Sequence, residues 1–112
     1  MEVNIQTEPG RVIARLRGEI DHHAAIRLRE KLDRVIEGGE YSLLILDFSE
    51  ISFMDSSGIG LVLGRYKLMK RLGGHLLVRG ACSRILWMMQ MAGLEKLQIF
   101  ETERTKKHET DE

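Results

Sequence analysis

One apolar run near the middle of the chain constrains the fold more than any other feature. Residues 42–48 read Ser-Leu-Leu-Ile-Leu-Asp-Phe, a nearly continuous apolar run of the length of one strand. A strand with one solvated face alternates apolar and polar residues, whereas a strand covered on both faces does not. The run therefore predicts a central strand in a sheet that is covered on both faces.

The start of the chain predicts a β-hairpin. Val3 and Ile5 alternate with polar neighbours, and in the segment 12–17 every second residue, Val12, Ala14 and Leu16, is apolar while Ile13, Arg15 and Arg17 lie between them; Pro9 and Gly10 stand between the two segments. Proline presets φ for the second position of a type II turn, and glycine tolerates the positive φ of the third position. We therefore expect two antiparallel strands joined by a tight turn.

Helical spacing of apolar residues predicts three helices. Asp21 is the natural N-cap of the first, and Ser83 is in position to cap the third. A short strand is predicted over 75–79, and a last edge strand over 97–100. The apolar stripes are Ala25, Leu28, Leu32, Val35 and Ile36 in the first helix, Ile59, Val62, Leu63, Tyr66 and Met69 in the second, and Ile85, Leu86, Met88 and Met89 in the third.

The order of these elements predicts the α/β class. Strand, helix, strand, helix and strand after a hairpin give a mixed sheet of four to five strands, whose later strands run parallel because the helices act as right-handed crossovers. A length of 112 residues is sufficient for one domain over 1–112, with amphipathic helices packed on the sheet. Residues 101–112 are polar, so we expect this tail to be frayed.

Composition argues against several classes of function. The 17 basic residues balance the 17 acidic ones, which gives no general attraction to nucleic acid or to an anionic membrane. Cys82 is the single cysteine, so no internal disulfide forms, and a small buried thiol is expected. The first residues lack the pattern of a signal peptide, and no apolar run approaches a membrane span. We therefore expect a cytoplasmic protein.

The stretch with the most distinctive chemistry is residues 55–60, Asp-Ser-Ser-Gly-Ile-Gly, between a predicted strand and a predicted helix. A serine at a helix start lies beside unsatisfied backbone N–H groups and the positive end of the helix dipole. This position suits an anion, a cap, or both. In α/β sheets, functional groups collect where strands end and helices begin.

Three enzyme motifs fail on spacing here. A nucleophile elbow needs glycine two residues before the serine, but Met54 precedes Ser56 and Asp55 precedes Ser57 at that distance. In a dinucleotide-binding loop the third glycine of residues 58–64 would come one residue earlier, and a phosphate loop needs a Gly-Lys-Ser/Thr ending. We therefore expect no enzymatic activity and no cofactor.

Other chemistry-bearing residues are assigned to surface or core. Adjacent His22 and His23 point in different directions on a helix and lack partners at ligand spacing, so no metal site is expected. A solvated helix face is the first interpretation of the basic residues Arg65, Lys67, Lys70 and Arg71, with partner contact as the alternative. Core or core edge is expected for Trp87, Met88, Met89 and Met91.

The roles of the two serines stay open at this point. Ser56 is either an N-cap or a hydroxyl that a kinase modifies, and Ser57 is assigned to capping or to orienting the loop. Asp55 either orients the acceptor hydroxyl, binds a partner group, or only favours the helix start. Gly58 and Gly60 let the helix lie close to the sheet and leave room for another chain's backbone.

Two segments resemble a known family. Residues 18–23, Gly-Glu-Ile-Asp-His-His, and residues 53–67, Phe-Met-Asp-Ser-Ser-Gly-Ile-Gly-Leu-Val-Leu-Gly-Arg-Tyr-Lys, are similar to the anti-sigma factor antagonists, and most of all to the anti-sigma F factor antagonists of sporulation. The resemblance extends from Val3 to about Phe100 and implies a STAS domain. It also places the turn at Asp21 near the partner-binding surface.

The resemblance implies a switch rather than an enzyme. In this family the serine directly after the aspartate, here Ser56, is phosphorylated by the partner, the anti-sigma F factor, which is a serine kinase that uses ATP. A phosphatase of the PP2C type reverses the modification. The unphosphorylated antagonist binds the anti-sigma factor and frees sigma F for forespore transcription. A related STAS antagonist in a general stress-response sigma pathway is the alternative.

The position of Ser56 suggests how such a switch would work. A phosphate adds about −1.5 to −2 charges beside Asp55, which disrupts a close interface through repulsion and desolvation cost. Because a helix start tolerates an anion, we expect the backbone to stay almost intact. The expected partner-binding residues are Asp21, Asp55, Ser56, Ser57, Gly58 and Gly60.

Overall fold

The computed structural model describes residues 1–101 and begins with the predicted hairpin. β1 (Glu2–Glu8) pairs antiparallel with β2 (Gly10–Ile20), and the pair of Glu8 with Arg11 closes the ladder at the turn. Gly10 takes a φ of +80°, in the left-handed region that glycine adopts without strain. The predicted hairpin is therefore confirmed.

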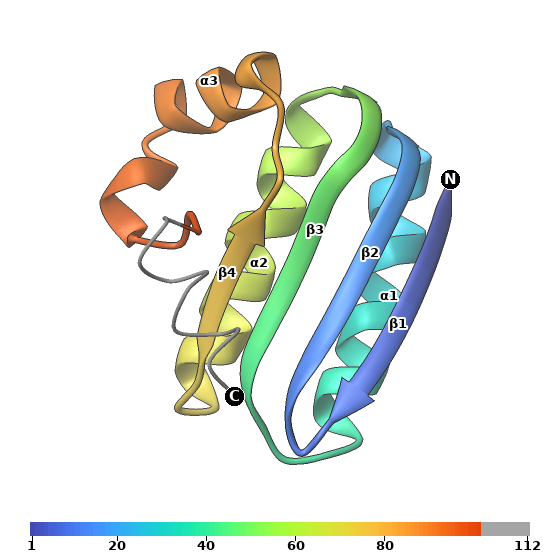
Figure 1. Cartoon of the computed structure of the whole chain (residues 1–112), viewed down its shortest axis with the longest axis vertical. Coiled ribbons are helices and arrows are strands. Elements are labelled where there is room, and N and C mark those ends of the chain that lie inside the picture. The colour runs from blue at the N-terminus through green and yellow to red at the C-terminus, as the bar shows by residue number, and fades with distance from the viewer. Residues whose placement is uncertain (102–112) are drawn as a thin grey trace.

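The remaining strands run parallel and complete a four-stranded mixed sheet in the order β1-β2-β3-β4 (Figure 1). β3 (Tyr41–Met54) pairs parallel with β2, and β4 (His75–Arg79) pairs parallel with β3. Leu44, Ile45 and Leu46 of β3 are completely buried, as their apolar run predicts. The predicted α/β class and mixed sheet are confirmed.

β3 is longer than the apolar run from which it was predicted. It covers 14 residues, and its more polar second half still pairs with β2, ending with the pair of Ile20 and Met54. Hydropathy identifies only the buried part of a strand, whereas backbone hydrogen bonds continue where side chains are exposed. As a result, β2 and β3 end side by side at the same end of the sheet.

Helix α1 (His22–Glu37) confirms the predicted first helix. Its buried residues are Ala24, Ala25, Leu28, Leu32 and Ile36, while Val35 is only half-buried. Gly38 follows as the C-cap. Together with α2, this helix covers one face of the sheet (Figure 1).

Helix α2 (Ser56–Arg71) confirms the second predicted helix but not the whole of its predicted buried stripe. Val62 and Met69 are buried as expected, whereas Ile59, Leu63 and Tyr66 are only half-buried. The other buried members of this helix are Gly58, Leu61, Arg65 and Leu68. The burial of an arginine was not expected and is described below.

Helix α3 (Ser83–Met91) buries only Ile85 and Met89. It lies beyond β4, toward the end of the sheet at which β3 ends (Figure 1). Trp87 and Met91 are 60% and 69% exposed, so the expectation that they belong to the core or its edge is wrong. A short helix at the margin of a fold covers little apolar surface and leaves most of its own face in water.

The start of α3 also differs from the prediction. The N-cap is Cys82, whose side chain makes no capping hydrogen bond, and Ser83 is already the first helical residue. The Cys82 thiol is exposed rather than buried. Both expectations are therefore wrong, because the helix begins one residue earlier than the serine signal indicates and places Cys82 at its solvated end.

The predicted edge strand at 97–100 does not form. A short 3-10 helix, η1 (Leu94–Leu97), occupies its start, and Gln98 takes a left-handed φ of 58° that interrupts an extended segment. Only an isolated parallel bridge joins Phe100 to Val78. The sheet described by residues 1–101 therefore has four strands, at the lower limit of the prediction.

Glu101 is held to β4 although it begins the predicted frayed tail. Its backbone N–H donates to the Val78 carbonyl at 2.9 Å, and its carboxylate accepts from Arg79 Nε at 2.9 Å. The rest of the tail predicted at 101–112 lies outside the described residues. Within residues 1–101, no helix is both long and apolar enough to cross a membrane.

Candidate functional site

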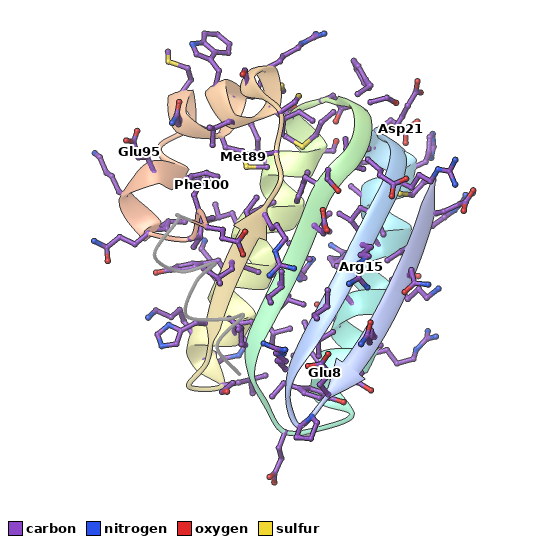
Figure 2. The ribbon with its side chains drawn as sticks, in the orientation of Figure 1. Glu8, Arg15, Asp21, Met89, Glu95 and Phe100 are labelled. Atoms are coloured by element: carbon purple, nitrogen blue, oxygen red, sulfur yellow. The ribbon has the colours of Figure 1, made fainter. Side chains whose placement is uncertain are left out.

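The candidate site lies where β2 and β3 end side by side. Their last paired residues are Ile20 and Met54, and the N–H of Asp55 donates to the Ile20 carbonyl at 3.1 Å. An aspartate follows each strand, Asp21 or Asp55, and a helix follows each aspartate. Figure 2 shows Asp21 at this end of the sheet. Two segments that are distant in sequence therefore form one surface.

Asp21 caps α1, as predicted. Its carboxylate accepts from the N–H of Ala24 at 2.8 Å, and its backbone is extended, with φ of −98° and ψ of −174°. The Ala24 hydrogen bond is the largest cause that lowers the pKa of Asp21 below its ordinary value, and the neighbouring His23 lowers it further. Asp21 is thus a carboxylate at neutral pH.

Asp55 caps α2 in nearly the same way. Its carboxylate accepts from the N–H of Ser57 at 2.8 Å, with φ of −101° and ψ of −173°. Ser56 and Ser57 are therefore the first two helical residues, and neither serine is the N-cap. The capping role that the sequence left open for both serines is wrong, because the aspartate one position earlier already holds the free N–H group.

Ser56 is the more accessible of the two hydroxyls. Ser56 is exposed, whereas Ser57 is half-buried. In the part of the chain that the structure describes, the Ser56 side chain has no hydrogen-bond partner. A free hydroxyl at the first position of a helix can be approached from solvent, and an anion attached there is favoured by the helix dipole.

The two glycines of this first turn have different roles. Gly58 is buried, and a Cβ added to it would lie 2.3 Å from Cγ of Met54, so its missing side chain makes room for the core. Gly60 is exposed, and an added Cβ would meet nothing within 4 Å. Of the two, only Gly60 offers an open surface to another chain.

A groove runs between α1 and α2 beside the two serines, with a volume of about 280 Å³. We name it the α1–α2 groove. It is lined by His22, Ala25, Ile26 and Arg29 from α1 and by Ser57, Gly60, Leu61 and Arg65 from α2. Its walls are therefore partly apolar, and its ionisable groups are all basic types.

A buried ion pair joins the two helices next to this groove. Arg65 of α2 lies with its Nε 2.8 Å from Oδ1 of Asp33 on α1, and the two side chains are 7% and 29% exposed. Although this distance is short, the N–H does not point at the oxygen, so neither atom has a hydrogen bond of good geometry. The expectation that Arg65 lies on a solvated helix face is wrong.

Burial lowers the pKa of the Arg65 guanidinium, and Arg29 acts in the same direction, while the Asp33 carboxylate opposes both. An arginine nevertheless stays protonated, since its ordinary pKa is far above neutral. The ion pair was not predicted from the sequence, because arginine is usually assigned to the solvent-exposed surface. The spacing of Arg65 with Leu61 and Leu68, four and three residues away, was the signal that could have found it.

Two adjacent histidines, His22 and His23, begin α1. The rings of His22 and His23 contact edge to face, with centroids 5.8 Å apart. Across residues 1–101, no three His, Cys, Asp or Glu side chains are grouped as metal ligands are.

The model of the STAS domain family matches residues 2–106 of this sequence. The chain therefore belongs to the STAS domain family.

Within that family the chain is similar to anti-sigma factor antagonists. It is 34% identical over 104 residues to the anti-sigma F factor antagonist of Paenibacillus polymyxa, a match that covers 92% of this chain and 89% of that protein. To the anti-sigma-B factor antagonist of Bacillus subtilis it is 30% identical over 97 residues, or 87% of each chain. Both relatives are named as antagonists of anti-sigma factors.

Two solved structures of the antagonist SpoIIAA share the fold. The unphosphorylated form matches 98% of this chain and 96% of its own, with a TM-score of 0.83 and 30% identity. The phosphorylated form, from Bacillus, matches 97% of this chain and 99% of its own, with a TM-score of 0.76 and 30% identity. The predicted resemblance to the antagonists is confirmed.

Proposed function

We propose that this chain is an anti-sigma factor antagonist that phosphorylation of Ser56 switches off. The unphosphorylated form binds the anti-sigma F factor, a serine kinase that uses ATP, and sigma F is released. Transfer of the terminal phosphoryl group of ATP to Ser56 Oγ ends this binding. A phosphatase of the PP2C type hydrolyses the phosphoserine and restores the active form.

The observation that supports this proposal is the accessibility of Ser56. It is the exposed first residue of α2, and its hydroxyl is not engaged by any of the residues that the structure describes. A kinase can therefore reach it without unfolding the helix. Ser57 is half-buried and faces the α1–α2 groove, which makes it the poorer acceptor.

The binding surface proposed for the anti-sigma factor consists of the two helix starts. Asp21, Asp55 and Ser56 follow the paired ends of β2 and β3, and Ser57 and Gly60 continue this surface into the groove. Gly58 acts on the surface indirectly, by seating the first turn of α2 against Met54. A chain that docks here lies directly over the phosphorylation site.

The proposed switch acts by charge. A phosphate at Ser56 adds about −1.5 to −2 charges to a surface that already holds the carboxylates of Asp21 and Asp55. Docking would bury this excess charge, which is costly unless the partner supplies matching cations. The similarity of this fold to both the phosphorylated and the unphosphorylated SpoIIAA supports a switch without refolding.

One experiment tests the partner, the reaction and the residue together. The protein is incubated with ATP and the anti-sigma F factor of its own organism, and any phosphate is located by mass spectrometry. We expect phosphate on Ser56 in the wild type and in Ser57→Ala, and none in Ser56→Ala. Ser56→Ala should stay bound to the kinase, whereas Ser56→Asp should bind poorly. Equal affinities of these two variants, or phosphate on Ser57, would contradict the proposal.

A related role in a general stress-response pathway is the second candidate. The similarity to the anti-sigma-B factor antagonist of Bacillus subtilis, at 30% identity, favours it specifically. The two roles differ in the partner and not in the chemistry at Ser56. Affinities of the unphosphorylated protein for anti-sigma factors of the sigma F and sigma B types, measured side by side, separate them: the tighter partner identifies the pathway.

A further inference from the structure

The α1–α2 groove continues the proposed binding surface and has a chemistry of its own. Ser57 and Gly60, from the first turn of α2, line one wall, and His22 and Ile26 line the other. At about 280 Å³ it is near the lower limit of about 300 Å³ for small-molecule sites, so it suits a side chain better than a nucleotide.

The charged groups that line the groove have one sign. Arg29 and Arg65 are cations, His22 is basic, and none of the eight lining residues is acidic. The carboxylate of Asp33 offsets only part of this charge, since among residues 1–101 it pairs with Arg65 and not with Arg29. The start of α2 adds the positive end of its dipole at the same place, where the Asp55 cap is the nearest carboxylate. A negatively charged group is therefore the complementary occupant.

Arg65 gives an independent indication of a missing acceptor. Its side chain is only 7% exposed, and Nη1 is buried without a hydrogen-bond partner among the described residues. Nε also lacks a hydrogen bond of good geometry, despite its closeness to Asp33. A buried, unpaired donor is costly to maintain, and an incoming oxygen acceptor would remove this cost.

We propose that the α1–α2 groove receives a glutamate or aspartate side chain of the anti-sigma factor, with Arg29 and Arg65 as its cationic partners and Ile26 and Leu61 against its aliphatic part. This inference rests on the proposed function, because it names the chemistry with which the same partner is recognised. It also explains specificity, since charge complementarity selects partners and speeds their encounter.

The proposal is tested with a matched pair of charge reversals on α1. Arg29 and Arg27 are both exposed on this helix, but only Arg29 lines the groove. Affinity of the unphosphorylated protein for the anti-sigma factor is measured by titration calorimetry at low and high salt. We expect Arg29→Glu to weaken binding about tenfold or more and to reduce its salt dependence, whereas Arg27→Glu should change it less than about twofold.

A charge scan of the partner completes the test. Single Asp→Lys and Glu→Lys variants of the anti-sigma factor are titrated against Arg29→Glu, and one of them should restore binding to this variant while it weakens binding to the wild type. Thermal unfolding of Arg29→Glu verifies that it folds like the wild type. Equal effects of Arg27→Glu and Arg29→Glu, or the absence of any restoring variant, would overturn the proposal.

These outcomes separate the groove from the switch. If the wild type binds the anti-sigma factor and Ser56→Asp does not, the proposed function stands, and an unaffected Arg29→Glu overturns only the groove. If the wild type itself does not bind, both inferences fail.

Discussion

Asp55 supports the helix that presents Ser56, and its contribution can be divided into capping and charge. Asp55→Ala removes the acceptor for the Ser57 N–H, which is bound at 2.8 Å, so we expect the free energy of unfolding to fall by about 1 kcal/mol. Asp55→Ser keeps a capping oxygen without the charge and should recover most of this loss. Urea unfolding of the three proteins measures both effects. Equal losses in both variants would show that charge, and not the cap, matters.

Gly58 and Gly60 both lie near the start of α2, but their replacement by alanine should change the stability in different ways. Gly58→Ala places a Cβ against the buried Met54 side chain and should lower the free energy of unfolding by about 1–2 kcal/mol. Gly60→Ala meets nothing within 4 Å and gains helix propensity, so we expect stability to be unchanged or raised by about 0.5 kcal/mol. Thermal unfolding checks this order. The affinity of Gly60→Ala for the anti-sigma factor should nevertheless fall, because the added methyl group narrows the groove.

The N-cap of α2 could not be predicted from the sequence, although the N-cap of α1 could. The sequence predicted Asp21 as a cap, because it stands alone before a clear helical stripe. At residues 55–57, Asp, Ser and Ser are all good N-caps, and composition does not choose among three adjacent candidates. The choice depends on where the strand ends, and here the hydrogen bond from Asp55 to Ile20 fixes that point.

The ion pair of Asp33 and Arg65 joins helix α1 to helix α2. Asp33→Ala leaves a cation that is only 7% exposed without its counter-ion, so the free energy of unfolding should fall by about 2 kcal/mol. Arg65→Met leaves a carboxylate that is 29% exposed and can be hydrated, so the loss should be smaller, about 1 kcal/mol. The double variant should be more stable than Asp33→Ala alone. Urea unfolding of all four proteins completes this double-mutant cycle.

The reverse order, with Arg65→Met as the more damaging change, would contradict this account. It would mean that the aliphatic packing of Arg65 matters more than the compensation of its charge.

The helices and strands that were predicted correctly are those with the strongest local signals in the sequence. The hairpin, α1 and β4 combine periodic apolar residues with glycine or proline at their ends, and all three were predicted correctly. The buried face of α2 was predicted only in part, because the burial of Arg65 depends on Asp33 of another helix. The strand expected at 97–100 does not form, because Gln98 adopts a left-handed conformation that its residue type does not predict.

At the scale of the whole molecule, the central prediction is that phosphorylation leaves the fold unchanged. We expect differences in amide chemical shifts between the two forms to be confined to the ends of β2 and β3, the first turn of α2 and the α1–α2 groove. The reason is that a helix start tolerates an added anion, so charge changes there without a change in packing. Two-dimensional NMR spectra of the two forms measure this directly, and shifts that spread to β1 or to the loop around Gly73 would refute it.

Because α3 is exposed, the fluorescence of Trp87 can report the binding of a partner to this helix. Trp87 is the single tryptophan of the sequence and is 60% exposed, so its fluorescence emission should resemble that of an indole in water and change little on unfolding. Because α3 lies toward the same end of the molecule as the end of β3, a protein that docks there and also covers α3 would shift this emission to shorter wavelength. Intrinsic fluorescence is thus a poor measure of folding in this chain, but a label-free test of whether a partner's footprint extends to α3.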